Sequence, residues 1–310
     1  MKVLAPVALA LASCLVLAAS ATAKKPRTMY YLSLGDSLSV GIQPGPADNP
    51  GQQALSVPTD TGYSDQLYAK AKRLYPGLKL VKAGCSGATT TNMLRGGAYV
   101  NGIVGCDQRQ PLYTSASART SQMAYAEKFM RGHRGQMAFV TVSIGNNDLD
   151  TCLAPTGVDL ACVMRGQQDI NRDVRTIGRR LSRAAGSGVP VIGTTFYDPF
   201  LGLYLQGGDL AGAAAASQVL ARSINEQTLI PGWRRNRVEV ARIDVAFGTD
   251  ISFSQTVDNP TFGTIPKAVS NVCNYTWFCT PAPVGPNIHA NKTGYGVIAD
   301  AFFAQLRAAA

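Results

Sequence analysis

Histidine is almost absent from this chain of 310 residues, which contains only two. No cysteine pair has the Cys-x-x-Cys spacing of a thiolate metal site either, so we expect no bound metal ion. Internal repeats, low-complexity tracts and nucleic-acid-binding motifs are also missing. The chain is therefore not expected to be a repeat protein or to bind nucleic acid.

Long apolar runs are confined to the start of the chain. The run 3–19 follows a lysine and precedes the small-residue sequence Ala-Thr-Ala at 21–23, which is typical of a secretory signal peptide. We expect removal of 1–23, leaving 24–310 as one secreted, monomeric domain with no membrane span. An alternative is a lipid anchor at Cys14, because Leu-Ala-Ser-Cys resembles a lipoprotein processing box. The continuation of the apolar run past this cysteine argues against it.

The remaining cysteines are even in number. In an exported chain such a set predicts disulfides, although the sequence alone leaves the pairing open. The spacing favours local closure into the pairs Cys85–Cys106, Cys152–Cys162 and Cys273–Cys279.

The chain is basic, with a formal net charge of +10. Much of the excess comes from arginines in the segment 165–185, where Ile170, Val174, Ile177 and Leu181 keep helical spacing. This pattern is typical of a helix with one buried face and one solvated face, so we assign the arginines no specific partner.

Apolar strand candidates alternate with amphipathic segments along the chain. The strand candidates are 29–34, 79–83, 137–144, 190–195 and 237–243, and the helix candidates are 63–75, 118–131, 165–185, 209–228 and 294–308. Alternation of this kind predicts right-handed crossovers and a parallel sheet with helices on both faces. We therefore predict a three-layer α/β/α fold with a five-stranded parallel sheet in the flavodoxin-like order 2-1-3-4-5. The long segments 42–62 and 245–290 are expected to form functional walls or lids.

Polar clusters follow the first three strands. They are Gly-Asp-Ser-Leu at 35–38, Ser-Gly-Ala-Thr at 86–89 and Gly-Asn-Asn-Asp at 145–148. In a parallel sheet all three lie at the carboxyl edge, around the point where the strand order reverses and α/β proteins bind ligands. Each cluster alone is an ordinary turn, but their convergence predicts a site with Ser37 at its centre.

A serine hydroxyl needs an adjacent base before it can act as a nucleophile. His133 lies in a turn that enters the third strand at its amino end, on the wrong side of the sheet. His289 directly precedes the final helix, which places it back over the carboxyl edge. We therefore predict His289 as the base. Backbone N–H groups of Ser37 and Gly87 and the Asn147 side-chain amide can supply an oxyanion hole.

Together these blocks resemble the SGNH (GDSL) hydrolase family, named for its Ser, Gly, Asn and His. The matching pieces occur in the family's order along 24–310, ending with His289 and the following Gly-Tyr at 294–295. The resemblance implies that Ser37 is the nucleophile, that Gly87 and Asn147 complete the oxyanion hole, and that His289 is the general base. The six cysteines also resemble those of secreted actinobacterial members with three disulfides.

The sequence departs from the family pattern at two places. Lys82 stands where many relatives have Asn at the end of the second strand. The Asp that commonly precedes the histidine is replaced by Pro286 and Asn287. Some family members use a backbone carbonyl in place of that carboxylate. We therefore expect a Ser–His dyad, with a carbonyl of Pro286 or Asn287, or the Asn287 side-chain oxygen, accepting the His289 Nδ1–H. Asp258 and Asp148 are distant alternatives for this acceptor.

These parts predict a secreted carboxylic ester hydrolase that needs no cofactor. Lipid esters, short-chain esters and acylated polysaccharides all remain open as substrates. Apolar residues of loops are candidates for an acyl pocket: 196–201, Leu203, Tyr204, Phe247, Phe253, Phe262, Tyr275, Trp277 and Phe278. The alternatives are a catalytically silent envelope-binding protein with the same fold, which the missing acidic partner favours, and an acyltransferase that uses the same serine.

Overall fold

The computed structural model describes residues 27–45, 56–96, 105–106, 121–150, 152–154 and 157–309. The expected signal segment 1–23, including Cys14, lies outside these residues, so its removal remains a prediction. Within the described ranges, no helix has both the length and the apolar character needed to cross a membrane.

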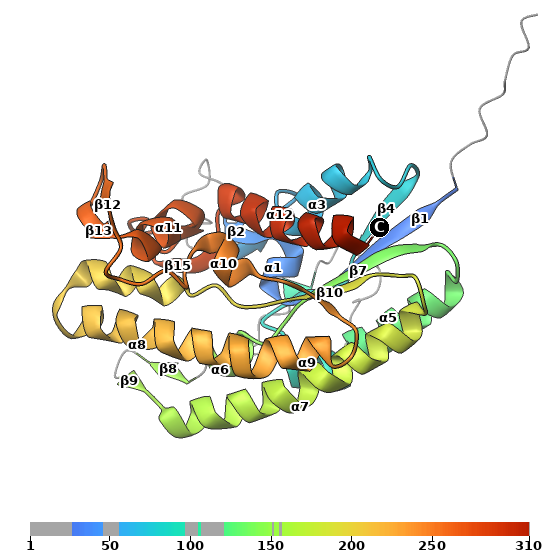
Figure 1. The fold of residues 1–310 in the computed structure, drawn as a ribbon, viewed down its shortest axis with the longest axis horizontal. Helices are drawn as coiled ribbons and strands as arrows, with labels where there is room; N and C mark the ends of the chain where they lie inside the picture. The colour runs from blue at the N-terminus through green and yellow to red at the C-terminus, as the bar shows by residue number, and fades with distance from the viewer. Residues whose placement is uncertain are drawn as a thin grey trace, which may run out of the picture.

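A five-stranded parallel sheet forms the centre of the molecule (Figure 1). Its strands in chain order are β1 (Met29–Gly35), β4 (Leu78–Lys82), β7 (Met137–Ser143), β10 (Val191–Thr194) and β11 (Glu239–Ala241). They lie side by side in the order β4–β1–β7–β10–β11, with every pairing parallel. The predicted order 2-1-3-4-5 is therefore confirmed.

The central strand β7 is buried along its whole length, as its continuous run of apolar and small residues predicts. It pairs with β1 so that Gly35 lies opposite Ser143 at the end of both strands. The polar segments that follow these strands consequently leave the sheet at the same edge.

Helices cover both faces of the sheet, which confirms the three-layer fold. One face carries α3 (Tyr63–Ala71), α10 (Ile243–Phe247) and α12 (Lys292–Ala309); the other carries α4 (Thr90–Arg95), α5 (Gln122–Gly132), α7 (Leu160–Ala185) and α9 (Ile230–Arg234) (Figure 1). Each face has its own apolar core. The stripe expected on α7 is fully buried, while the helix begins earlier than predicted because Asp159 caps it by accepting from the Cys162 N–H.

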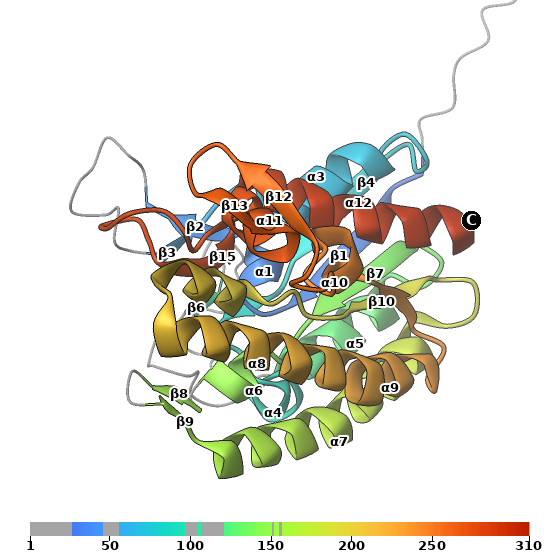
Figure 2. The ribbon, with the colours of Figure 1, turned by 60° about the vertical axis from the view of Figure 1, so that its left-hand side comes forward.

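The segment 245–290 contains β12 (Thr256–Asn259), β13 (Gly263–Pro266), α11 (Lys267–Tyr275), β14 (Thr276–Trp277) and β15 (Asn287–Ala290). Part of it packs against η3 (Pro199–Gln206), a 3₁₀ helix, and forms a third, smaller core that includes Leu201, Val269 and Phe278. Figure 2 shows this layer beside α8 (Gly208–Ile224). The long segment therefore has a core of its own.

Several short elements complete the described part of the chain. They are α1 (Ser37–Val40), β2 (Ile42–Pro44), β3 (Ser56–Pro58), β5 (Cys85–Ser86), β6 (Gly105–Cys106), α6 (Asn147–Asp150), β8 (Leu153–Ala154), β9 (Gly157–Val158) and the π-helical η4 (Asn225–Leu229). Most of them lie in the connections at the carboxyl edge of the sheet.

Two of the expected disulfides are present, Cys152–Cys162 and Cys273–Cys279. Cys85 is also disulfide-bonded, and its backbone pairs with that of Cys106 across β5 and β6. The side chain of Cys106 lies outside the described residues, so this third pairing remains a prediction.

Candidate active site

Ser37 is the first residue of α1, directly after β1 and a tight turn. Gly35 has φ = 127° and lies so close to β7 that a Cβ atom there would overlap the Ser143 carbonyl oxygen. Asp36 caps the short helix by accepting a 3.1 Å hydrogen bond from the Leu38 N–H. The turn therefore fixes where Ser37 stands at the end of the sheet.

The second and third polar clusters are bound to each other. The Asn147 side-chain amide donates to the Ala88 carbonyl at 3.0 Å, next to Gly87, whose φ of 75° forms the turn. The amide nitrogen carries two hydrogens, so this bond leaves one for another acceptor. The predicted oxyanion donors thus belong to one connected loop pair.

Asp148 strengthens the same connection. Its two carboxyl oxygens accept from the Thr90 N–H at 2.8 Å and from the Thr90 hydroxyl at 2.6 Å. Burial raises the pKa of Asp148 to about 6, although both hydrogen bonds from Thr90 oppose the shift. Asp148 thus joins α6 to α4 and holds the Gly87 turn in place.

His289 lies on β15, and the side chain of Asn287 on the same short strand contacts its ring. The Asn287 Oδ1 atom is 2.8 Å from His289 Nδ1 and 3.0 Å from the His289 backbone nitrogen. The Asn287 Nδ2 atom donates to the Ser56 hydroxyl on β3 at 3.3 Å. The side chain of Asn287 is therefore held at both ends.

This geometry defines the tautomer of the ring. The backbone N–H of His289 can only donate, so the atom it meets on Asn287 must be the oxygen rather than the amide nitrogen. An oxygen acceptor requires a proton on Nδ1, which leaves Nε2 of the neutral ring with its lone pair. The unprotonated nitrogen is the one a general base needs.

Burial lowers the pKa of His289 to about 4. The cause is desolvation of the charged ring, because a cation loses more than a neutral group when water is removed. A carboxylate beside the ring would oppose this shift, but the partner is the uncharged amide of Asn287. His289 is therefore neutral across the range from mildly acidic to basic pH.

A cavity of about 470 Å³ opens beside these residues, and Ser37, Asn147 and His289 all line it. The structure thus brings the predicted nucleophile, one oxyanion donor and the predicted base to one surface. Gly87 is not among the lining residues and is connected to the cavity through Asn147. Pro286 and Asn287 are not among the lining residues, and Asn287 contacts the His289 ring at Nδ1.

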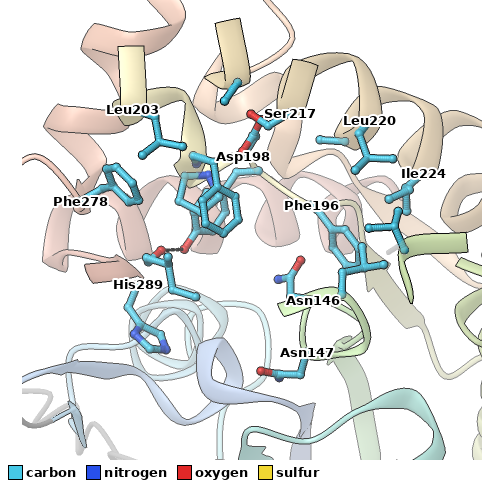
Figure 3. A pocket seen from close by; sticks show the side chains of 18 of the residues that line it. Asn146, Asn147, Phe196, Asp198, Leu203, Ser217, Leu220, Ile224, Phe278 and His289 are labelled. Carbon is cyan, nitrogen blue, oxygen red and sulfur yellow. Dashed lines mark hydrogen bonds between the residues drawn. The ribbon is translucent and has the colours of Figure 1, made fainter. Parts of the chain in front are cut away.

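The wall of the cavity is mostly apolar (Figure 3). The lining side chains from the predicted set are Phe196, Tyr197, Asp198, Pro199, Phe200, Leu203 and Phe278. The other members of the predicted set do not line it, so that part of the pocket prediction was wrong: Leu201, Tyr204, Phe247, Phe253, Phe262, Tyr275 and Trp277. Phe247, for example, stacks on Tyr197 in one of the main cores. Phe253, in turn, packs edge-on against Tyr204 of η3.

The α8 helix provides a further wall of the cavity that was not predicted from the sequence. The lining residues of this helix are Leu210, Ala213, Ser217, Leu220, Ala221 and Ile224. Their spacing of three or four residues places them on one helix face. The spacing was the available signal, but in an alanine-rich helix it does not distinguish a pocket wall from a face packed in a core. Leu149, Val163 and Asn146 were missed as well.

Asn225 holds Phe196 at the cavity wall. It is the first residue of the π-helical segment η4, and its side chain accepts from the Phe196 N–H at 2.8 Å and donates to the Phe196 carbonyl at 2.9 Å. A Cβ atom on Gly145 would contact the Phe196 ring at 2.8 Å. The ring therefore packs closely against the loop that carries Asn146 and Asn147.

The remaining candidate residues make other contacts. His133 ends α5 before β7, stacks on Phe129 and contacts the carbonyl of that residue through Nδ1 at 2.8 Å. Lys82 is buried, forms a 2.9 Å ion pair with Asp65 and donates to the Thr59 carbonyl, also at 2.9 Å. The lysine that departs from the family pattern thus fastens α3 to the segment around β3.

No protein-family model matches the sequence, and no curated protein sequence matches it. Among solved structures, phospholipase A1 from Streptomyces albidoflavus NA297 aligns with a TM-score of 0.52 and 17% identity over 90% of this chain and 99% of that chain. The extracellular lipase of Streptomyces rimosus aligns with a TM-score of 0.48 and 16% identity over 91% and 100%. An acetylxylan esterase from Geobacillus stearothermophilus aligns with a TM-score of 0.47 and 14% identity over 91% and 96%.

The likeness to the phospholipase A1 extends over nearly the whole of both chains. At this identity it shows a shared fold. With its five-stranded sheet order and helical layers, the chain has the same three-layer α/β/α fold as this phospholipase A1.

Proposed function

We propose that this protein is a secreted serine ester hydrolase of the SGNH type that cleaves carboxylic esters through an acyl intermediate on Ser37. The observation that carries the proposal is that Ser37, Asn147 and His289 line one apolar cavity while Asn287 orients the imidazole ring from behind. The proposed dyad is Ser37 and His289, and Asn287 takes the positioning role through its side-chain oxygen.

In the first step Ser37 Oγ attacks the ester carbonyl carbon and its proton passes to His289 Nε2. The negative oxygen of the tetrahedral intermediate would be stabilised by the N–H groups of Ser37 and Gly87 and by the Asn147 amide. Collapse of this intermediate breaks the ester C–O bond, and His289 returns its proton to the leaving alkoxide. Water then repeats the sequence on the acyl-enzyme and releases the acid.

The apolar wall supports an ester with an acyl chain rather than a highly polar acyl group. One solved structure with this fold is named as a phospholipase A1, which agrees with such a substrate class. The two disulfides are consistent with an oxidising compartment and so support secretion.

A p-nitrophenyl ester series, from acetate to long-chain esters, tests the proposal. We expect hydrolysis by the wild-type protein and a loss of at least about 10³-fold in kcat for Ser37→Ala, because no other group replaces the nucleophile. Ser39→Ala, in the same short helix, is the matched control for changes in folding. Equal rates for wild type and Ser37→Ala would favour the catalytically silent alternative.

A further inference from the structure

Two polar side chains of the cavity, Asp198 and Ser217, have no part in the proposed chemistry. In Figure 3 they lie on the opposite side of the cavity from His289 and Asn147, with apolar side chains between. Asp198 is only 3% exposed, so its carboxylate has almost no access to bulk water. A buried carboxylate in a mostly apolar wall is costly and calls for a physical explanation.

Both side chains line the cavity and carry oxygens that can accept hydrogen bonds. Asp198 accepts from the Phe200 N–H at 2.9 Å and from the Ser217 hydroxyl at 2.7 Å. Ser217 has a single hydroxyl proton, and its two acceptors in range are Asp198 and, at 2.9 Å, the Ala214 carbonyl. Carboxylate and hydroxyl oxygens each keep further lone pairs after these bonds. A hydrogen-bond donor on a bound molecule would bond to one of these oxygens.

Capping η3 accounts for Asp198 but not for Ser217. Asp198 accepts from the first turn of that helix, a role that a carboxylate at a helix start commonly has. On α8, in contrast, residues 211–216 are all Ala or Gly, and Ser217 is the polar residue among the described lining residues of the helix. An alanine at 217 would fit the same face but would leave one oxygen of Asp198 without the bond that Ser217 donates.

We propose that Asp198 and Ser217 form a subsite that binds a hydroxyl group on the acyl chain of the substrate. The inference rests on the proposed function and narrows its substrate class to esters of hydroxylated acids. A chain hydroxyl would donate to one of the two side chains. An unsubstituted chain that reached the same point would remove water from the carboxylate and return no hydrogen bond.

A hydroxyl fits this place better than an ammonium group. The surrounding wall is apolar, and the single carboxylate already accepts two hydrogen bonds. Bringing an ammonium group there would cost its hydration, and Asp198, whose two oxygens already accept hydrogen bonds, would have to compensate for all of that loss.

The test compares p-nitrophenyl esters of ω-hydroxyalkanoic acids with the unsubstituted esters of equal chain length, from octanoate to hexadecanoate. The measured quantity is the ratio of kcat/KM for the hydroxylated and plain members of each pair. We expect the wild-type ratio to exceed one by about tenfold at one chain length, where the hydroxyl reaches the subsite. In an apolar cavity without the subsite, the ratio would stay below one at every length.

Ser217→Ala is the decisive variant, because it keeps the cap that Asp198 provides for η3. It should reduce the ratio at the preferred length by about five- to tenfold. Asp198→Asn should reduce it as well. Ser223→Ala on the same helix, which does not line the cavity, is the matched control and should leave the ratio unchanged. A ratio at or below one throughout in wild type, or an unchanged ratio in Ser217→Ala, would overturn the proposal.

Failure of this inference is separable from failure of the proposed function. Ser37-dependent hydrolysis of p-nitrophenyl acetate reports the function alone, because its acyl group is too short to reach across the cavity. Calorimetric binding of an ω-hydroxyalkanoate and the matching alkanoate to Ser37→Ala tests the subsite without turnover. Tighter binding of the hydroxylated acid, lost in the Ser37→Ala/Ser217→Ala double variant, would support the subsite, and equal binding would refute it.

Discussion

Asn287 Oδ1 lies 2.8 Å from His289 Nδ1, where a Ser-His-Asp triad would place a carboxylate. An amide oxygen can orient the ring by accepting a hydrogen bond from its Nδ1–H, but it brings no negative charge to stabilise the imidazolium. The proposed enzyme therefore depends on orientation and on a base of low pKa. The predictions below follow from that combination and from the loops that surround it.

The first prediction concerns the acidic limb of the pH profile. Only the neutral ring can accept the Ser37 proton, and the pKa of His289 is lowered to about 4. Activity should therefore be retained as the pH falls below the ordinary histidine value of about 6.5, and be lost only near pH 4. The measurement is kcat/KM of a p-nitrophenyl ester against pH, with circular dichroism to verify that the protein stays folded. A midpoint at or above about 6.5 would contradict the assignment.

The second prediction concerns Asn287 itself. Asn287→Ala should lower kcat by about 10- to 100-fold, because the hydrogen bond that holds the ring and stabilises its charged form is lost. Asn287→Asp should raise the pKa of His289, since a negative charge favours the imidazolium, and so move the acidic limb to higher pH. We expect its kcat at pH 8 to differ from wild type by less than about tenfold.

An increase of several orders of magnitude in Asn287→Asp would show that the chain is an impaired triad rather than a dyad. Asn291→Ala is a suitable control for this pair of variants. Asn291 also lies in the loop beside β15, but it donates to the Asn274 carbonyl and does not contact the ring.

The third prediction concerns the oxyanion hole. Asn147→Ala should lower kcat by about 10²–10³-fold with a much smaller effect on KM, because the donor acts on charge that develops in the transition state. Asn146→Ala removes a neighbouring amide of the same size and is the comparison variant. Equal losses for the two variants, or a loss for Asn147→Ala that appears only in KM, would argue against this role.

The fourth prediction concerns the disulfides. Cys152–Cys162 joins the end of α6 to the start of α7, between the cavity residues Leu149 and Val163. Cys273–Cys279 closes the loop that carries Phe278. Reduction should lower activity at temperatures where the oxidised protein is stable, because the disulfides fix loops of the cavity and small displacements of site residues reduce the rate. Activity should be assayed alongside a count of free thiols. Full activity after verified reduction would refute the prediction.

The sheet could be predicted because its signal is local. Buried strands such as Met137–Ser143 read as continuous apolar runs, and helices such as α7 show their buried stripe in the sequence. Alternation of the two types leaves few topologies, and the order 2-1-3-4-5 followed. The ends of α7 and α8 were less accurate, because caps and a π-helical turn decide them.

The cavity wall was predictable only in part. Phe196 and Phe200 come directly after a strand, so the sheet edge itself places them near the site. Phe253 and Trp277 look equally suitable in the sequence, but they belong to a segment with its own core, where contacts distant in sequence decide which way a ring points. The α8 face carries little sequence signal, since alanine suits a core and a pocket equally.

The partner of His289 was left open among two backbone carbonyls and the side chain of Asn287, with Asp258 and Asp148 as distant alternatives. The two carbonyls and the side chain belong to two adjacent residues. The sequence does not determine the backbone torsion angles that decide which of these groups lies nearest the ring. Coordinates distinguish them because Oδ1 of Asn287 meets both the ring and the His289 N–H. The catalytic roles of Ser37 and His289 themselves remain predictions for the experiments above.

The paired bonds between Asn225 and the main chain of Phe196 give the cavity a fixed edge. Because that edge is tied down by the backbone, exchange of the aromatic side chain would change the width of the opening without shifting its position. Divergence in acyl preference among close relatives should consequently accumulate on α8, where single substitutions alter the cavity profile and leave the scaffold intact.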